Sequence, residues 1–319
     1  MKNRVKNIAY RMGILKILLL VQRLFLKAPL ILMYHRLTAY NGNNISVDDF
    51  EQHLIFLKEN CEIVTLDIAI RDVNKPSRGK LKVAITFDDG YEDFYHLAWP
   101  ILKKHDVPAT LFITTGFIDK SVWLWPDKID YILKNSNGFT AQLDGFGELQ
   151  FTQETTKEAW HRLGDYCLVK PWKQRDKLIN QLAVSLGVEL PQQPVQGYQG
   201  LTWSQLKEMS AEGLSIESHT VTHPILSTLN PLEIKEELSV SKQVIETNIN
   251  QRVNIICYPN GFARDVSNTV EEQARACGYK YGVMACFDKQ TANNPYRIGR
   301  TSAAKEISTL VIGLLRASK

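Results

Sequence analysis

The feature that most constrains this chain is an apolar strand that ends in two adjacent carboxylates. Residues 83–87 read VAITF, a run rich in β-forming residues, and Asp88, Asp89 and Gly90 follow directly. Aspartate is a poor strand residue, and two carboxylates at a strand end repel each other. A bound cation would offset this cost, because it neutralises one carboxylate and leaves the other free as a base. The alternative is a polar turn in which either aspartate caps a helix that begins near Tyr91.

A second stretch, ESHTVTHP at residues 217–224, supplies two histidines. His219 and His223 are four residues apart, so they face the same way if the chain makes a helical turn there. Taken alone, such a pair is more often two surface histidines. Together with one carboxylate, two imidazoles make a three-ligand set that leaves a divalent metal open to water and substrate. The two stretches in combination therefore predict a catalytic metal site.

Three motifs in this order resemble those of the polysaccharide deacetylases, also called the NodB-homology family or carbohydrate esterase family 4. The motifs are TFDDG at residues 86–90, HTVTH at 219–223 and YPNG at 258–261. A weaker likeness runs from about residue 30 to the end of the chain. The resemblance implies a distorted (β/α)7 barrel and a metal-dependent hydrolase that acts on non-peptide C–N bonds, removing N-acetyl groups from sugars.

The resemblance also assigns roles to individual residues. It implies that Asp89, His219 and His223 hold the metal and that Asp88 is the general base. The backbone N–H of Asn260 is the expected donor to the oxyanion. Many relatives have an aromatic residue at this position, but only the backbone is needed. Zinc suits the aspartate–histidine–histidine set, although nickel, cobalt, iron and manganese also accept carboxylate and imidazole ligands.

Two departures from the commonest branch of the family concern the groups that assist the base. That branch has an arginine two residues before the proline turn, and this chain has Cys257 at that position. That branch also has a general-acid histidine near its C-terminus, and no histidine follows His223 in this chain.

The better match is the permuted branch typified by poly-N-acetylglucosamine deacetylases, in which an early Tyr-His supplies the acid. The sequence MYHR matches it, so His35 is the expected acid. Without the family, this residue reads as a core or surface histidine with a structural hydrogen bond. Arg300 is the expected replacement for the lost arginine, with Arg297 as the alternative.

Strand and helix patterns alternate along most of the chain. Repeated βα units favour parallel strands with outer helices. Every candidate site residue follows a strand, where an α/β barrel builds its site. The expected strands are 30–35, 62–66, 83–87, 109–114, 214–217, 253–258, 279–285 and 296–302, and the expected helices are 47–60, 91–105 (bent or divided near Pro100), 202–212, 230–248, 266–277 and 308–315.

Residues 118–200 interrupt this alternation, and we interpret them as a helical insertion that covers one mouth of the domain. They contain four of the six tryptophans, namely Trp123, Trp125, Trp160 and Trp172, and they end in the linker-like stretch LPQQPVQGYQG. These side chains would either stack on sugar rings or pack inside a small helical subdomain. Packing is the more common fate of tryptophan.

The N-terminal segment has an unusual charge. Residues 1–27 carry seven basic and no acidic side chains, whereas the remainder carries 31 basic and 34 acidic ones. The body therefore lacks the basic excess of a nucleic-acid-binding protein. The apolar run MGILKILLLVQRLFL is too short and too charged to span a bilayer, and it lacks the pattern of a cleavable signal peptide. With Lys16, Arg23 and Lys27 on one helical face, it is expected to lie on an anionic membrane surface. The alternative is a helix packed on the domain.

These observations predict a membrane-associated helix over residues 1–28 and a deacetylase domain over 29–319. Five cysteines without a CxxC pair favour reduced thiols and a cytoplasmic setting. We expect a peripheral enzyme on the inner face of a bacterial plasma membrane, acting on an N-acetylated glycan or a lipid-linked sugar. The alternatives are a sugar O-acetyl esterase and a catalytically inactive glycan-binding relative. The intact Asp88 beside a metal set argues against the inactive relative.

Overall fold

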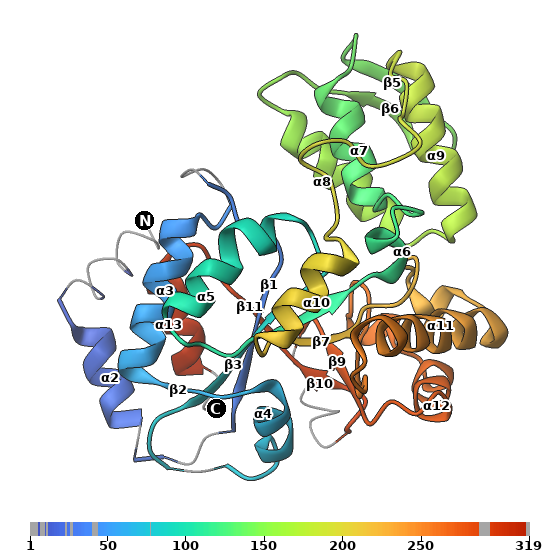
Figure 1. Ribbon diagram of the computed structural model, residues 1–319. Coiled ribbons are helices and arrows are strands. Elements are labelled where there is room, and N and C mark those ends of the chain that lie inside the picture. The colour runs from blue at the N-terminus through green and yellow to red at the C-terminus, as the bar shows by residue number, and fades with distance from the viewer. Residues whose placement is uncertain are drawn as a thin grey trace.

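The central element of the structure is a sheet of parallel strands that curls into a barrel (Figure 1). The computed structural model describes residues 6, 10, 12–22, 24–25, 28–39, 44–76, 78–286 and 294–316. The strand order is β10-β9-β8-β7-β4-β3-β1-β11, and β2 pairs with β3. These strands are β1 (Leu30–Tyr34), β2 (Glu62–Ile63), β3 (Lys82–Phe87), β4 (Thr110–Ile113), β7 (Ser215–Ser218), β8 (Ile255–Cys257), β9 (Tyr281–Met284), β10 (Ile298–Gly299) and β11 (Thr301–Ser302).

One short stretch of chain closes the barrel. Arg300 alone separates β10 from β11, yet β10 pairs with β9 and β11 pairs with β1, at opposite ends of the strand order. In these registers Ile298 lies opposite Val283, and Thr301 lies opposite Leu32. Residues 298–302 therefore act as the last strand of a nearly closed ring. This confirms the predicted distorted (β/α)7 barrel.

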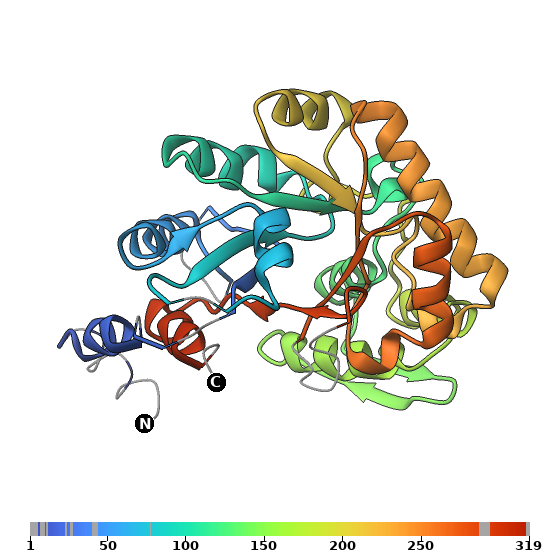
Figure 2. The same ribbon diagram turned by 90° about the horizontal axis from the view of Figure 1, so that it is seen from below.

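The barrel strands are apolar because both of their faces are covered. β1 is buried at all five positions, and β3 is buried at every position after Lys82. Continuous apolar runs of this kind are typical of parallel strands between two layers of side chains. Figure 2 shows the surrounding helices, which are α3 (Val47–Asn60), α4 (Leu66–Asp72), α5 (Trp99–Lys104), α10 (Trp203–Ala211), α11 (Pro231–Ile249), α12 (Asn268–Ala276) and α13 (Ile307–Arg316).

The start of α11 follows its sequence pattern closely. The Asn230 side chain accepts hydrogen bonds from the backbone N–H groups of Leu232 and Glu233, and the Glu233 carboxylate accepts one from the N–H of Asn230. Pro231, which has no N–H to satisfy, occupies the first helical position. This capping box fixes the start of α11, and so it fixes which side chains of the helix face the loop before it.

The chain between α3 and β3 differs from expectation. The strand predicted over residues 62–66 ends at Ile63, and Leu66 already begins α4. Thr65 caps this helix by accepting a hydrogen bond from the N–H of Ile68. A two-residue strand and a seven-residue helix are both shorter than the window in which hydrophobic periodicity is visible. The sequence pattern therefore merged them into one strand and a loop.

The bend predicted near Pro100 is present as a π-helical turn, η1 (Phe94–Ala98), directly before α5. The N–H of Trp99 donates to the carbonyl of Phe94, five residues back. Proline has no N–H for a helical hydrogen bond, and a wider turn before it accommodates this loss. Such π-turns are frequent near functional sites, and this one follows the two aspartates.

Residues 119–200 form a lobe beside the barrel, reached through α6 (Thr115–Ile118) (Figure 1). Its elements are α7 (Trp125–Lys134), β5 (Thr140–Leu143), β6 (Gly147–Gln150), α8 (Thr156–Leu168) and α9 (Trp172–Ser185). Leu163, Leu182 and other buried apolar residues of the lobe form a cluster separate from the barrel core. The lobe is mainly helical, as expected, and it also contains an antiparallel hairpin of β5 and β6. Strands of four residues give too weak an alternation to be recognised in the sequence.

The lobe returns to the barrel next to the two aspartates. The N–H of Glu92 donates to the carbonyl of Gln199 at 3.0 Å, and the N–H of Leu201 donates to the carbonyl of Gly90 at 2.9 Å. The hydroxyl of Tyr91 donates to the buried carboxylate of Asp127 on α7 at 2.8 Å. These bonds attach both ends of the lobe to the segment that follows β3.

The N-terminal helix α2 (Ile14–Gln22) packs through one face only. Leu15, Leu19 and Gln22 are buried, and the Gln22 amide donates to the carbonyls of Leu314 and Leu315 at the end of α13. The large apolar side chains on the other face are exposed, namely Ile14, Ile17, Leu18, Leu20 and Val21. Arg23 and Lys27, which were expected to share a face with Lys16, lie outside the described residues. No helix in the described part of the chain is long and apolar enough to cross a membrane.

Candidate active site

The candidate site lies at the carboxyl ends of the parallel strands. Asp88 and Asp89 follow β3, His219 follows β7, and His35 follows β1. The turn at 258–261 follows β8. Because parallel strands present their carboxyl ends at one edge, residues from distant parts of the sequence meet there.

Asp89, His219 and His223 bring three ligand atoms together. The carboxylate Oδ1 of Asp89 lies 3.5 Å from Nε2 of His219 and 3.4 Å from Nε2 of His223. Ligand atoms that share one tetrahedral ion at about 2.1 Å lie about 3.4 Å apart. The three residues therefore fit a single divalent cation, and they form one of the two candidate metal sets among the described residues.

The two histidines approach each other through a strained loop and not through a helical turn. Thr220 and His223 both have positive φ, at 70° and 58°, and the residues between β7 and the next short helical turn are irregular. The hydroxyl of Thr220 accepts a hydrogen bond from the N–H of His223 at 3.1 Å. The chain therefore does not make the helical turn that would align the two histidines by their spacing, yet the two rings still meet, with centroids 4.8 Å apart.

Glu237 of α11 holds this loop from behind. Its carboxylate accepts hydrogen bonds from the N–H groups of Val221 and Thr222 at 2.8 and 2.9 Å, and from the hydroxyl of Thr222 at 2.5 Å. Groups behind the ligands of a metal site commonly fix their orientation. Nothing near the histidines in the sequence points to Glu237, because it lies on the next helix.

His219 has one ring nitrogen committed to the protein. Its Nδ1 lies 2.8 Å from the carbonyl oxygen of Cys257, which only accepts, so Nδ1 carries a proton and Nε2 is the nitrogen left for a metal ion. This nitrogen faces Asp89. For His223, burial lowers the pKa to about 4, so its imidazole is in the neutral form that binds metals.

A second group of possible ligands comprises Asp88, His219 and Cys257. Burial raises the pKa of the Cys257 thiol, and a protonated thiol is a poor metal ligand. Its sulfur also lies 3.0 Å from a guanidinium nitrogen of Arg300. The set with Asp89 therefore fits a cation better than the set with Cys257.

Asp88 is buried and paired with Arg300. The two guanidinium nitrogens Nη1 and Nη2 donate to its two carboxylate oxygens, both at 2.7 Å, in a bidentate pair. Burial alone would raise the pKa of Asp88, but the charge and hydrogen bonds of Arg300 lower it below its ordinary value. Arg297, the alternative from the sequence, pairs instead with Glu271. The structure thus brings Arg300 and not Arg297 to the aspartate.

Cys257 makes room for this arginine. Its thiol lies beside the pair of Arg300 and Asp88, 3.0 Å from a guanidinium nitrogen and 3.6 Å from the nearer carboxylate oxygen. A small side chain at the end of β8 leaves space for a guanidinium that arrives from the closing strand. This explains how a chain without an arginine before the proline turn still places one on Asp88.

His35 lies close to Asp88 on the open side of the site. Its Nε2 is 3.9 Å from Oδ2 of Asp88, and its side chain is 49% exposed. The next residue, Arg36, stacks on the ring of Tyr91 and forms an ion pair with Asp93, which anchors the chain beside His35. His35 was expected on the rim that carries Asp88, and its ring lies close to that carboxylate.

The turn after β8 contains two residues with positive φ. Asn260 has a φ of 61°, and its side-chain amide donates to Asp265 at 2.6 Å. Among the described residues, no acceptor pairs with the N–H of Asn260. Gly261 also has a positive φ, and a Cβ there would lie 2.7 Å from the backbone nitrogen of Ala285. The turn therefore needs glycine at 261, and it leaves the Asn260 N–H available to an oxyanion.

Sequence comparisons place these features in a known context. The profile of the polysaccharide deacetylase family matches residues 75–282, which is more than half of the chain. YxkH of Bacillus subtilis, a provisionally assigned polysaccharide deacetylase, is 26% identical over 257 residues, covering 79% of this chain and 63% of that protein. The poly-β-1,6-N-acetyl-D-glucosamine N-deacetylase of Staphylococcus aureus is 38% identical over 76 residues, which is 24% of this chain and 26% of that enzyme. The matches therefore span less than two thirds of the length of these relatives.

Solved structures show the same fold at low sequence identity. The Streptococcus pyogenes deacetylase PplD, solved in complex with acetate, has a TM-score of 0.59 and 23% identity, and the alignment covers 92% of this chain and 98% of PplD. IcaB from Ammonifex degensii has a TM-score of 0.58 and 19% identity, with 91% and 97% of the two chains covered. At this level of identity the similarity establishes the fold.

Proposed function

Because the chain belongs to the polysaccharide deacetylase family, we propose that it removes the N-acetyl group from an N-acetylated sugar of a bacterial glycan or lipid-linked saccharide. The observation that carries this proposal is the pairing of two adjacent aspartates with different partners. Asp89 faces His219 and His223, whereas Asp88 faces Arg300. One carboxylate is thus in a ligand set and the other is an ionised base beside it.

A divalent cation, with zinc as the first choice and nickel, cobalt, iron or manganese as alternatives, would polarise the acetyl carbonyl and make water a better nucleophile. Asp89, His219 and His223 would hold it. Asp88 accepts the proton of the attacking water, and Arg300 keeps its carboxylate ionised and oriented.

The remaining groups complete the hydrolysis. Water oxygen bonds to the acetyl carbon, and the N–H of Asn260 donates to the oxyanion that forms. The C–N bond then breaks, and His35 gives a proton to the departing nitrogen, which yields acetate and a free amine. An O-acetyl ester would need no such proton, so the position of His35 favours N-deacetylation over O-deacetylation.

We also propose that the protein works at the surface of a membrane, on its cytoplasmic side. The exposed apolar face of α2 supports this, because Ile17, Leu20 and Val21 point away from the packed residues Leu15 and Leu19. A short helix with one face buried in protein and another exposed and apolar suits the interface of an anionic bilayer. Lys16, the cation within α2, forms an exposed ion pair with Glu59, 3.4 Å away.

The test is acetate release by the full-length protein after metal removal and reloading with each of the five candidate ions. Substrates are β-1,6-linked N-acetylglucosamine oligomers, lipid-linked and nucleotide-linked N-acetyl sugars, and O-acetylated counterparts. The proposal requires metal-dependent release from at least one N-acetyl substrate. Asp88→Asn should keep bound metal and lose turnover, whereas Asp89→Asn should lose metal. Release from esters alone would establish the esterase alternative, and no metal binding would overturn the mechanism.

A further inference from the structure

A cleft of about 650 Å³ separates the lobe from α11. One wall is formed by α7, α9 and the segment before α7, and the other wall is formed by α11 and the loop between the metal-site histidines. Val221 and Thr222 of that loop line the cleft. Thr222 directly precedes His223, and consecutive Cα atoms are about 3.8 Å apart. The cleft therefore adjoins the loop that carries His223, and its volume falls in the range of ligand pockets, roughly 300–1,000 Å³.

The lobe side of the cleft contains a buried arginine without a carboxylate partner. Arg175 is only 5% exposed, and its Nε finds no hydrogen-bond acceptor. No carboxylate among the described residues lies within ion-pair distance of it, and its guanidinium stacks on the ring of Trp125 at 5.0 Å. Burial lowers the pKa of Arg175. A buried guanidinium with unused donors is costly, so a site that retains one has a use for it.

The other groups of the cleft complement a carbohydrate. Trp123 also lines it, and its buried indole N–H has no acceptor in the described part of the chain. Asp176 and Glu236 contribute carboxylate acceptors, and Trp172 contributes an aromatic side chain that is 41% exposed. Sugar hydroxyls both donate and accept hydrogen bonds, and the C–H faces of sugar rings pack on aromatic rings. Unused donors, acceptors and aromatic faces thus occur together in one cleft.

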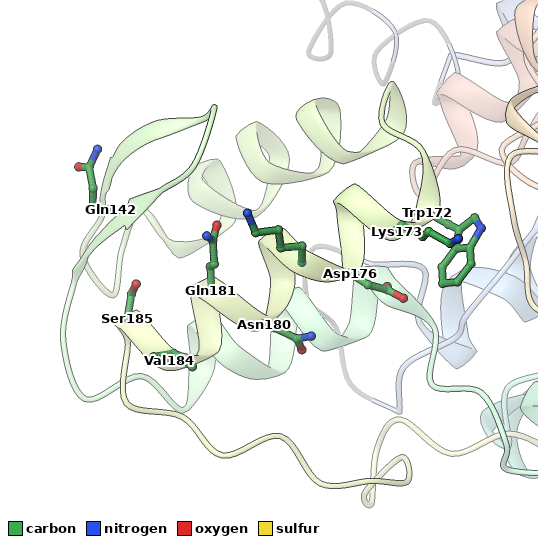
Figure 3. Close-up of a pocket in the computed structure, with 9 residues that line it drawn as sticks. Gln142, Trp172, Lys173, Asp176, Asn180, Gln181, Val184 and Ser185 are labelled. Atoms are coloured by element: carbon green, nitrogen blue, oxygen red, sulfur yellow. The ribbon is translucent and has the colours of Figure 1, made fainter.

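The same surface continues onto the outer side of the lobe. Trp172, Asp176 and Asn180 line the cleft and also a shallow groove along α9. Figure 3 shows these side chains following one another along the helix, with Gln181 beside them and Gln142 on the hairpin. The surface of aromatic, amide and carboxylate side chains that lines the cleft thus continues along the outer face of α9.

We propose that this cleft is a second saccharide subsite, which binds sugar units adjoining the one whose acetyl group is removed. The substrate is accordingly a chain of several N-acetylated sugars and not a single sugar on a carrier. This inference rests on the proposed function, because it extends the substrate of the same site. Arg175 and Trp123 donate to sugar hydroxyl or acetyl oxygens, and Trp172 packs against a sugar ring.

An anionic ligand such as a phosphate group would be the other partner for a buried arginine. The cleft also contains the carboxylates of Asp176, Glu233, Glu236 and Glu237, against the two cations Lys128 and Arg175. This excess of negative charge repels an anion. An uncharged sugar chain has no such penalty, which is why the observations favour it.

The test compares chain lengths. Acetate release is measured on N-acetylglucosamine and on its trimer and hexamer, for the wild type and for Trp172→Ala, Arg175→Gln and Val184→Ala. Val184 lies on the same helix, is 82% exposed and lines the outer groove without lining the cleft, so it is the matched control. We expect the wild type to prefer the hexamer, and we expect Trp172→Ala and Arg175→Gln to raise its KM by about tenfold or more. The kcat of Trp172→Ala and Arg175→Gln and their activity on the single sugar should equal those of the wild type. Val184→Ala should equal the wild type in every kinetic parameter.

Titration calorimetry with the hexamer keeps this inference distinguishable from the proposed function. Asp88→Asn should bind the hexamer more tightly than the single sugar even if none of these sugars is deacetylated, and adding Trp172→Ala should remove the difference. Trp172 is partly exposed, so this variant should fold even if Arg175→Gln does not. Three outcomes would overturn the proposal. The first is an equal loss of activity on short and long substrates, and the second is a wild type without preference for the hexamer. The third is competition by inorganic phosphate that disappears in Arg175→Gln.

Discussion

His35 and Asp88 are neighbours whose environments suit opposite tasks. Asp88 is buried against Arg300, whereas His35 is half-exposed toward the open side of the rim. An amide nitrogen leaves poorly as an anion, so its departure needs a proton. We expect His35→Ala and His35→Asn to slow amide hydrolysis by about 10²–10⁴-fold and to leave metal binding intact. An activated ester should be affected much less, because its leaving group needs no proton.

The comparison of substrates is the measurement that decides this role. kcat/KM is determined for both variants on an N-acetyl sugar and on an activated acetyl ester, with metal content as the control. An equal loss on both substrates would mean that His35 is structural. An unchanged rate on the amide would remove it from the mechanism.

Glu237 is a positioning residue, because its hydrogen bonds go to the loop and not to the three candidate metal ligands. Its three hydrogen bonds hold Val221 and Thr222 between the two histidines. Glu237→Ala should weaken metal binding by about 10–100-fold, which is the usual effect of losing a group behind the ligands. Chelator competition measures the affinity, and Glu237→Gln should recover part of it. Glu236→Ala is the matched control on the same helix, and an equal effect from it would contradict this role.

The family resemblance predicted which side chains meet in the site, but not the backbone that brings them together. Four of the seven non-glycine residues with positive φ among the described residues are Asp89, Thr220, His223 and Asn260. Such conformations persist only where surrounding contacts hold them, and they cluster at functional sites. Those contacts come from distant segments such as α11, so a local pattern interpreted as a helical turn contains no sign of them.

At the scale of secondary-structure elements, the link between β3 and α7 makes a pH-dependent contribution to stability. Asp127 of α7 accepts a hydrogen bond from Tyr91, and burial raises the pKa of Asp127 to about 7. The unfolded carboxyl ionises near pH 4, about three units lower. Between these values the unfolded state releases a proton that the folded state keeps, so stability falls as pH rises from about 4 to 7.

Asp127→Asn should remove this part of the pH dependence, because an amide does not titrate while its oxygen still accepts from Tyr91. The free energy of unfolding is measured by urea titration at pH 4.5 and 7.5. The change between these two pH values should be smaller in the variant by about 3 kcal/mol. Asp165→Asn, at an exposed position of α8, is the control. A variant with the same pH dependence as the wild type would show that Asp127 is ionised in the folded protein.

Elements with strong local signals were predictable, and short ones were not. α11 begins at the predicted cap, and β3 occupies nearly the predicted residues. α4 and the hairpin β5–β6 were missed because each is only a few residues long. Their positions are set by packing, on the barrel for α4 and inside the lobe for the hairpin, and tertiary packing overrides weak local preference.

At the scale of the whole molecule, the exposed face of α2 predicts membrane binding that can be tested without unfolding the protein. Deleting residues 1–27 would also remove Leu15 and Leu19 from the core. The double substitution Ile17→Gln and Leu20→Gln changes only exposed positions. Binding to phosphatidylglycerol vesicles should fall by about tenfold or more, since each buried leucine or isoleucine contributes roughly 1.5–3 kcal/mol.

The control for this experiment is Val184→Gln, which replaces a more exposed apolar residue on the lobe. It should bind vesicles as the wild type does. Both proteins should keep wild-type activity on a short water-soluble substrate. Vesicle binding that survives the double substitution would mean that α2 serves only to pack against α13.

The position of Arg300 in the strand that closes the barrel ties its pairing with Asp88 to ring closure. A ribosome completes residues 89, 219 and 223 long before it releases residue 300, so a nascent chain contains all three candidate ligands while Asp88 still lacks its arginine partner. Until that strand docks, β1 and β9 each have an unpaired edge. Ring closure and the pairing of Asp88 with Arg300 therefore arise in the same event.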